Sequence, residues 1–107
     1  LWIDDLVAAY EAAAERIDIA SGQIYNLGGG PDNTMSIWAE FGSILSNLAG
    51  REIPVAYADW RVGDQHVFVS GIHKAERELG WRPRVSVRDG IERLGRWVGD
   101  NPQLFQR

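Results

Sequence analysis

The stretch Trp60-Arg61-Val62-Gly63-Asp64-Gln65 decides how this 107-residue sequence is interpreted, because apolar, strand-like runs flank it on both sides. Residues 53–57 precede it and residues 67–69 follow it. A loop held at both ends by strands can direct its charged side chains toward a ligand. Arg61 carries a planar fork of five donors that suits phosphate, and Gly63 allows a turn that other residues resist. The pattern therefore predicts a ligand-binding loop.

Asp64 and Gln65 add groups to this loop that can exchange hydrogen bonds with hydroxyls. The simpler interpretation is a polar hairpin loop with a surface ion pair between Arg61 and Asp64. Such pairs are common and contribute little free energy, so the spacing alone favours the simpler interpretation. Arg61, Asp64 and Gln65 are nevertheless the candidate binding residues of the chain.

Apolar residues recur at helical spacing in four segments, which predicts four helices. The first is expected to begin at Asp4 and end at Ser21-Gly22, and the second to run from a Ser36 cap to about Ala49. Two more follow nearer the C-terminus. They begin near Ser70 or Gly71 and at a Ser86 cap, and Gly80 is placed as the left-handed residue that ends the third helix. The residues expected to face inward are Leu6, Tyr10, Ala13 and Ile17; Ile37, Phe41, Leu45 and Leu48; Ile72, Ala75 and Leu79; and Val87, Ile91, Leu94 and Val98.

Strand candidates are residues 1–3, 24–27, 53–58 and 66–69, which are short and rich in β-branched and aromatic side chains. Together with the helices they predict the α/β class, with about four helices and three to four short strands. Residues 1–107 are expected to form one domain, because 107 residues are an ordinary domain length.

The composition excludes several classes of function. A net charge of −4 and an isoelectric point near 5.0 argue against a nucleic-acid partner. The absence of cysteine excludes disulfides and thiol chemistry, and no apolar run approaches the length of a membrane span. We therefore expect a cytoplasmic protein without a membrane segment. The chain starts at Leu1 rather than Met and has the character of a piece of a longer protein.

Few residues are arranged for catalysis or for cofactor binding. The glycine run 28–30 resembles the start of the GxGxxG dinucleotide motif, but Pro31 intervenes and Asn33 occupies the position of the third glycine. A plain turn between a strand and a helix is the simpler interpretation. His66 and His73 are the only histidines, and no cluster of three good ligands surrounds either of them, so no metal site is expected.

Four motifs together resemble the C-terminal third of extended short-chain dehydrogenases in the NAD-dependent epimerase/dehydratase family. In chain order they are Ile3-Asp4-Asp5-Leu6, Ile24-Tyr25-Asn26-Leu27-Gly28-Gly29-Gly30, Trp60-Arg61-Val62-Gly63-Asp64-Gln65 and Lys74-Ala75-Glu76-Arg77-Glu78-Leu79-Gly80-Trp81-Arg82-Pro83. The third motif, with Asp59 before it, is most similar to CDP-tyvelose (CDP-paratose 2-) epimerases. UDP-glucose 4-epimerases and nucleotide-sugar 4,6-dehydratases are the related alternatives. The resemblance implies that this chain is a fragment of an extended Rossmann-type enzyme.

The resemblance also implies roles for the loop residues. Arg61 would contact the diphosphate of a nucleotide sugar, Asp64 would lie near the ribose hydroxyls, and Gln65 would belong to the same substrate site. Two positions depart from many members of the family: Trp2 stands where a histidine is common, and Gly71 where an aspartate starts the third helix.

The chemistry implied by the resemblance requires parts that this chain lacks. NAD would be bound by an N-terminal Rossmann domain that also carries a Tyr-x-x-x-Lys pair. Lys74 is the only lysine and Ser70 stands four residues before it, so the pair is not here. The complete enzyme would oxidise the sugar with NAD and return hydride to the opposite face. The fragment alone is expected to be inactive and to contain no catalytic residue.

The expected partners are therefore a nucleotide-diphosphate sugar, the chain's own N-terminal Rossmann domain and further copies of itself. Without that domain, the first helix and residues 24–27 would leave apolar faces uncovered, which predicts self-association into a homo-oligomer. A non-catalytic binding or assembly module with the same fold is the alternative from another class of function.

Overall fold

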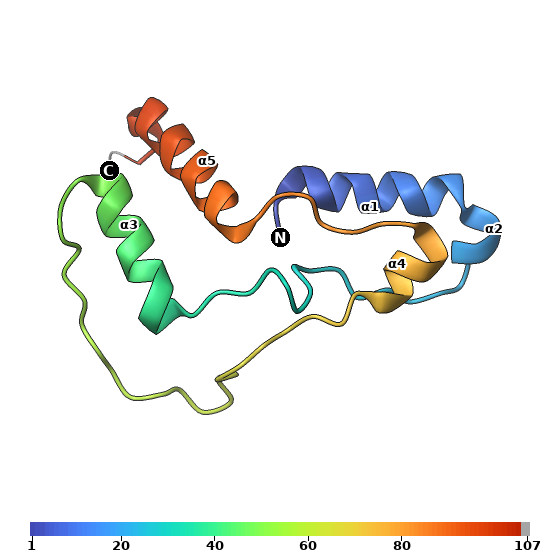
Figure 1. Cartoon of the computed structure of the whole chain (residues 1–107), viewed down its shortest axis with the longest axis horizontal. Helices are drawn as coiled ribbons and strands as arrows, with labels where there is room; N and C mark the ends of the chain where they lie inside the picture. The colour runs from blue at the N-terminus through green and yellow to red at the C-terminus, as the bar shows by residue number, and fades with distance from the viewer. Residues whose placement is uncertain (106–107) are drawn as a thin grey trace. The chain divides into compact units, whose positions relative to one another are not determined.

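The structure, a computed structural model, describes residues 1–105 apart from the side chain of Trp38. The chain divides into two units, one made of Leu1–Thr34 with the residues from 69 onward, the other of Met35–Phe68. The first unit contains α1 (Ile3–Glu15), α2 (Ile17–Ala20), α4 (His73–Leu79), α5 (Val87–Asp100) and a 3₁₀ turn, η2 (Pro102–Leu104) (Figure 1). The second contains a π-helical turn, η1 (Ile37–Phe41), which continues into α3 (Gly42–Ala49).

The prediction of strands, and with it the α/β class of a Rossmann-type fragment, is wrong. Residues 1–105 consist of helices and irregular segments and contain no strand. Residues 24–27, 53–58 and 66–69 have the side chains of strands, but a strand exists only through hydrogen bonds with a neighbouring strand. No backbone ladder joins these segments within the described part of the chain. Residues 1–3 do not form the predicted strand, because α1 already begins at Ile3.

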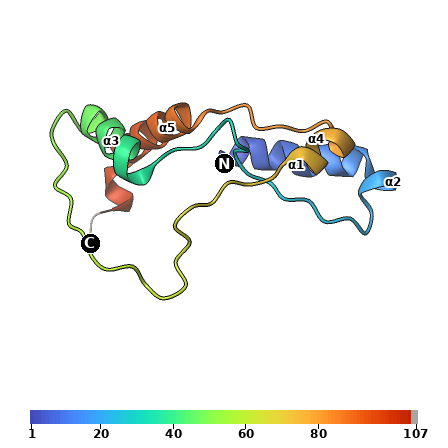
Figure 2. The same cartoon turned by 60° about the horizontal axis from the view of Figure 1, so that its bottom comes forward.

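α1 and α4 lie against each other and enclose the apolar core of the first unit (Figures 1 and 2). The buried apolar residues are Ala9, Ile72, Ala75, Leu79 and Trp81. The face that α1 turns toward this core is lined by alanines, whose short side chains let two helices approach closely. The inward positions predicted for the third helix, Ile72, Ala75 and Leu79, are confirmed.

Asp5 joins α1 to the segment that follows α4. Its side chain is buried, with 4% of the residue surface exposed. The two carboxylate oxygens accept hydrogen bonds from the backbone N–H groups of Arg84 and Val85 at 2.9 and 3.0 Å. The backbone carbonyl of Asp5 accepts a further bond, 2.8 Å long, from the indole N–H of Trp81. Asp5 is thus a long-range connector between α1 and the segment that follows α4.

The predicted helix ends are largely confirmed, because capping depends on local chemistry. The hydroxyls of Ser36 and Ser86 each accept a bond, 3.1 Å long, from the backbone N–H three residues later. Gly50 and Gly80 end α3 and α4 in the left-handed conformation, with φ of +64° and +66°. The start of the third helix was predicted two to three residues too early, since α4 begins at His73.

Several side chains that were predicted to face inward are exposed. On α1, Tyr10 is 70% exposed, because the helix packs through the face that carries Asp5 and Ala9 instead. Ile17, which begins α2, is 64% exposed. The same error affects η1, α3 and α5, where the exposed residues are Ile37, Leu48, Leu94 and Val98. Among residues 1–105, no helix combines the length and the apolar character needed to cross a membrane.

Candidate functional site

Arg61, Asp64 and Gln65 lie in the unit Met35–Phe68, on a loop that contains a tight turn. The N–H of Asp64 donates to the carbonyl of Arg61 at 3.1 Å, and Gly63 has φ of +88°. A positive φ at the third of four positions is the mark of a type II turn, which favours glycine there. The turn predicted from Gly63 is therefore present, although the strands expected on either side of it are not.

The Asp64 carboxylate fixes the direction of the Arg61 side chain. One oxygen, Oδ2, accepts from the backbone N–H of Arg61 at 3.1 Å and from its Nε at 3.3 Å. The Arg61 side chain is 87% exposed and that of Asp64 is 31% exposed, so the ion pair itself contributes at most about 1 kcal/mol. Its main effect is orientation: Nε is held, and the exposed terminal amino groups of the guanidinium are presented to solvent.

Two aromatic rings close the base of this loop. The rings of Trp60 and His66 are stacked, with centroids 4.0 Å apart and planes 16° apart. They stand three residues before and three residues after Gly63, which places them opposite each other across the turn. This symmetric spacing is the sequence signal by which the ring pair could have been predicted. The stack restrains the loop in the absence of a strand ladder.

The glycine run 28–30 does not fit a dinucleotide. A Cβ on Gly28 would overlap the hydroxyl of Ser70, and one on Gly30 would lie 2.8 Å from Ile72 Cδ1. The N–H of Gly30 donates to the same hydroxyl at 3.2 Å. These glycines are thus required by close packing within the chain, at Ser70 and Ile72, rather than by a bound dinucleotide. The simpler interpretation of the run as a turn holds.

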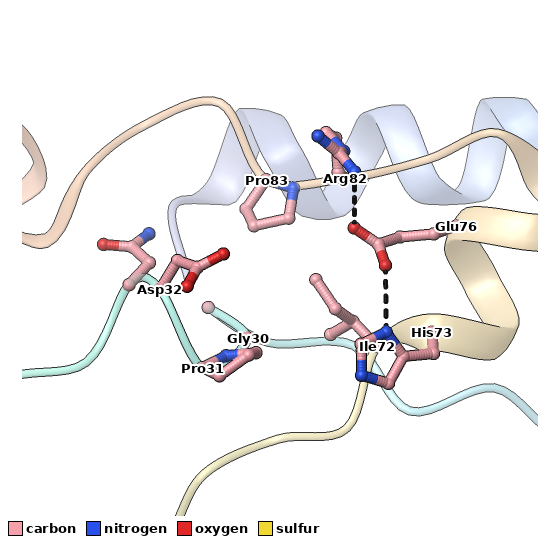
Figure 3. A pocket seen from close by; sticks show the side chains of 10 residues that line it. Gly30, Pro31, Asp32, Ile72, His73, Glu76, Arg82 and Pro83 are labelled. Carbon is pink, nitrogen blue, oxygen red and sulfur yellow. Dashed lines mark hydrogen bonds and ion pairs between the residues drawn. The ribbon is translucent and has the colours of Figure 1, made fainter.

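A cavity of about 380 Å³ opens in the first unit between three separate segments (Figure 3). They are the turn 29–33, the start of α4 and the pair Arg82-Pro83. Glu76 forms one wall, with Oε1 3.0 Å from Arg82 Nη2 and Oε2 3.3 Å from His73 Nδ1. The lining residues of this site are distant in sequence and belong to no shared motif, so the sequence alone did not predict it.

The comparison with known proteins shows similarity along nearly the whole chain. No protein-family model matches it. A CDP-paratose 2-epimerase from Salmonella typhi is 28% identical over 98 residues, which cover 92% of this chain and 29% of that protein. A UDP-glucose 4-epimerase from Arabidopsis thaliana is 33% identical over 104 residues, 95% of this chain and 29% of that protein. This chain is similar to one segment of the nucleotide-sugar epimerases.

A third relative, a UDP-glucuronate 4-epimerase from Thermodesulfobacterium geofontis, is 30% identical over 98% of this chain and 31% of its own length. The chain thus spans about 30% of the length of the epimerases that it matches. The three relatives differ in nucleotide, sugar or epimerised carbon, yet their identities to this chain are nearly equal. The similarity therefore supports the epimerase family and does not single out one member.

The lysine of this epimerase-like chain has a structural role. Lys74 Nζ donates to Gln23 Oε1 at 2.8 Å and to the carbonyl of Ile24 at 3.2 Å, and it lies 4.8 Å from the centre of the Tyr25 ring. The Tyr25 hydroxyl donates to Glu78 Oε2 at 2.8 Å. Burial and the Glu78 carboxylate raise the pKa of Tyr25 above its usual value of 10.0. A raised pKa opposes use of this tyrosine as a base near neutral pH.

The described residues form no candidate metal site. Within residues 1–105, no three side chains of His, Cys, Asp or Glu gather closely enough to hold a metal ion. His66 is engaged in the stack with Trp60, and His73 in the contact with Glu76.

Proposed function

We propose that this chain is the substrate-binding portion of an NAD-dependent nucleotide-sugar epimerase. The observation that carries the proposal is its similarity, over 92–98% of its length, to epimerases of three different nucleotide sugars. All three substrates share a nucleoside diphosphate joined to a sugar. A part of the enzyme that is common to these proteins is therefore suited to the shared diphosphate.

The Arg61–Asp64 turn has the chemistry for this role. A guanidinium is the side chain best matched to two phosphate oxygens, and here Asp64 already restrains it, which lowers the entropy lost on binding. The second carboxylate oxygen of Asp64, Oδ1, can accept from a ribose hydroxyl. The exposed amide of Gln65 can donate to or accept from the same nucleotide.

In this proposal NAD is bound by another part of the enzyme, because the glycine run 28–30 does not fit it. NAD supplies the acceptor and donor of the hydride that an epimerase moves. The residues of this chain orient the substrate, and the chain alone has no catalytic activity. Within the family we favour a CDP-tyvelose type of epimerase, because the form Asp59-Trp60-Arg61 followed by Gly63-Asp64-Gln65 is most similar to that group.

The test is calorimetric titration of the protein with UDP, CDP and the nucleoside uridine. Arg61→Ala should weaken UDP and CDP binding by about 10-fold to 150-fold, since a hydrogen bond to a charged group contributes about 1.5–3 kcal/mol. Uridine, which has no phosphate, should bind the variant and the parent equally. Arg51→Ala is the matched control, because Arg51 is another exposed arginine of the same unit. The proposal fails if both variants bind UDP like the parent protein.

A CDP-tyvelose type of enzyme should in addition bind CDP more tightly than UDP. An equal or reversed order would exclude that finer assignment and leave the diphosphate site in place. The diphosphate site is tested by the effect of Arg61→Ala, and the CDP-tyvelose assignment is tested separately by the preference for cytosine over uracil.

We also propose that the exposed apolar side chains are contact surfaces within the complete enzyme and, for this chain alone, between copies. On α1, Ile3, Val7 and Tyr10 recur at helical spacing on one exposed face, and Ile24 is also exposed. Sedimentation of the chain at increasing concentration should show association, and Val7→Glu should reduce it. A compact monomer at high concentration would contradict this proposal.

A further inference from the structure

The cavity lined by Gly30, Asp32, Ile72, Glu76 and Arg82 belongs to a different unit from the Arg61 turn and has no role in the function proposed above. We propose that it binds a second ligand, a compact ring compound that is not anionic and that carries several hydroxyl or ammonium donors. Its walls are ordered, carry a net negative charge and are shaped to receive a ring.

The walls are fixed by packing and hydrogen bonds rather than by mobile side chains. Gly30, with φ of +73°, packs directly on Ile72, which is 5% exposed and forms the floor. The Asn33 amide joins this turn to the chain after α4, because its Nδ2 donates to the Val85 carbonyl at 3.0 Å and its Oδ1 accepts from the N–H of Val87 at 2.8 Å. A cavity whose walls are already ordered loses little entropy when a ligand enters.

The charge of the lining selects against anions. Both oxygens of Glu76 are engaged, one by Arg82 and the other by His73, and this carboxylate is only 24% exposed. Asp32 stands on the opposite side of the cavity (Figure 3) and has no hydrogen bond or ion pair among residues 1–105. Two carboxylates and one guanidinium leave one negative charge when His73 is neutral. The acceptor that remains available to a ligand is therefore the Asp32 carboxylate.

The shape of the cavity suits a ring. In Figure 3 the ring of Pro83 lies above the opening and the ring of Pro31 lies below it, and with Ile72 they offer apolar surfaces against which the face of a saturated ring can pack. A volume of about 380 Å³ is near the lower end of the range for small-molecule pockets, which fits a single ring better than a nucleotide. Asp32 then stands where a ring substituent would meet an acceptor.

Three probes with the same pyranose ring and different charge test this inference: D-glucosamine, D-glucose and D-glucuronate. Each is titrated into the isotope-labelled chain while backbone amide chemical shifts are followed. Glucosamine should bind most tightly and glucuronate least, and the shifts should gather at residues 29–33, 72–76 and 82–83. Asp32→Asn should weaken glucosamine binding about twofold to fivefold, since an exposed charge pair contributes about 0.5–1 kcal/mol.

Asp18→Asn is the matched control, because Asp18 is an exposed aspartate of the same unit that does not line the cavity. It should leave the affinity for glucosamine unchanged. The inference is overturned if none of the probes shifts the lining residues, if glucuronate binds as tightly as glucosamine, or if both variants behave alike. These outcomes are independent of the UDP titration, so failure of the Arg61 proposal would be recognised separately.

Discussion

Replacement of Asp5 by alanine should be among the most damaging single substitutions in the first unit. The change removes both acceptors of the Arg84 and Val85 N–H groups, which are 2.9 and 3.0 Å from the carboxylate oxygens. A hydrogen bond to a charged group contributes about 1.5–3 kcal/mol, and the lower value applies because both bonds are only partly buried. The expected loss in the free energy of unfolding is thus about 3 kcal/mol.

Asp4→Ala is the matched control for this substitution. Asp4 stands in the same first turn of α1, so it has the same favourable interaction with the helix dipole. It is exposed, and among residues 1–105 its carboxylate accepts a hydrogen bond only from the Trp2 indole N–H, at 3.0 Å. Its loss should cost about 0.5 kcal/mol. The difference between the two variants therefore isolates the long-range hydrogen bonds of Asp5.

The assay is urea unfolding followed by circular dichroism at the helical band, together with amide hydrogen exchange. Asp5→Ala should lower the urea midpoint by about 1–3 M, since the slope for a small domain is about 1–3 kcal/mol/M. Exchange at Arg84 and Val85 should accelerate in this variant and stay unchanged in Asp4→Ala. Equal midpoints for the two variants, or unchanged exchange at both amides, would refute the assignment of Asp5 as the connector between α1 and the chain after α4.

Two further predictions concern the same unit. The free energy of unfolding should fall as the pH rises above about 10, because the raised pKa of Tyr25 means that the unfolded chain loses the tyrosine hydroxyl proton first. Denaturant titrations at pH 8 and pH 11 measure this fall, which should be smaller in Tyr25→Phe. A fall of the same size in both proteins would remove Tyr25 from the explanation. Gly30→Ala should destabilise the chain more than Gly22→Ala, although the two glycines have φ of +73° and +74°, because only the first alanine would meet Ile72, at 2.8 Å. Overpacking of this kind costs about 1–3 kcal/mol in thermal or urea unfolding, and equal losses would show that backbone strain alone matters.

The features that sequence analysis predicted correctly depend on neighbours in the chain. Ser36 and Ser86 cap helices through an N–H three residues away, and Gly80 ends α4 through its own backbone conformation. The turn at Gly63 is likewise closed by residues within four positions. Such interactions are present in the sequence itself, because no other segment has to be placed first.

The features that sequence analysis missed depend on partners that are distant in the chain. Residues 53–58 have strand composition, but their state is decided by whether a second strand lies beside them. The buried face of α1 was misplaced because an acid, Asp5, is buried there, and its partners are 79 and 80 positions away. The cavity beside Glu76 required three separate segments to be known in space.

The bonds between Asp5 and the residues from 81 to 85 also constrain how this chain is made. They join positions separated by 76 to 80 residues, so the segment on which α1 docks leaves the ribosome well after α1 itself. At a synthesis rate of about 5–20 residues per second, α1 waits for about 4–16 s with its alanine face unpartnered. Closing so long a loop is also slow compared with forming the helix itself. During that interval the nascent helix is exposed to proteases and is a natural substrate for a chaperone.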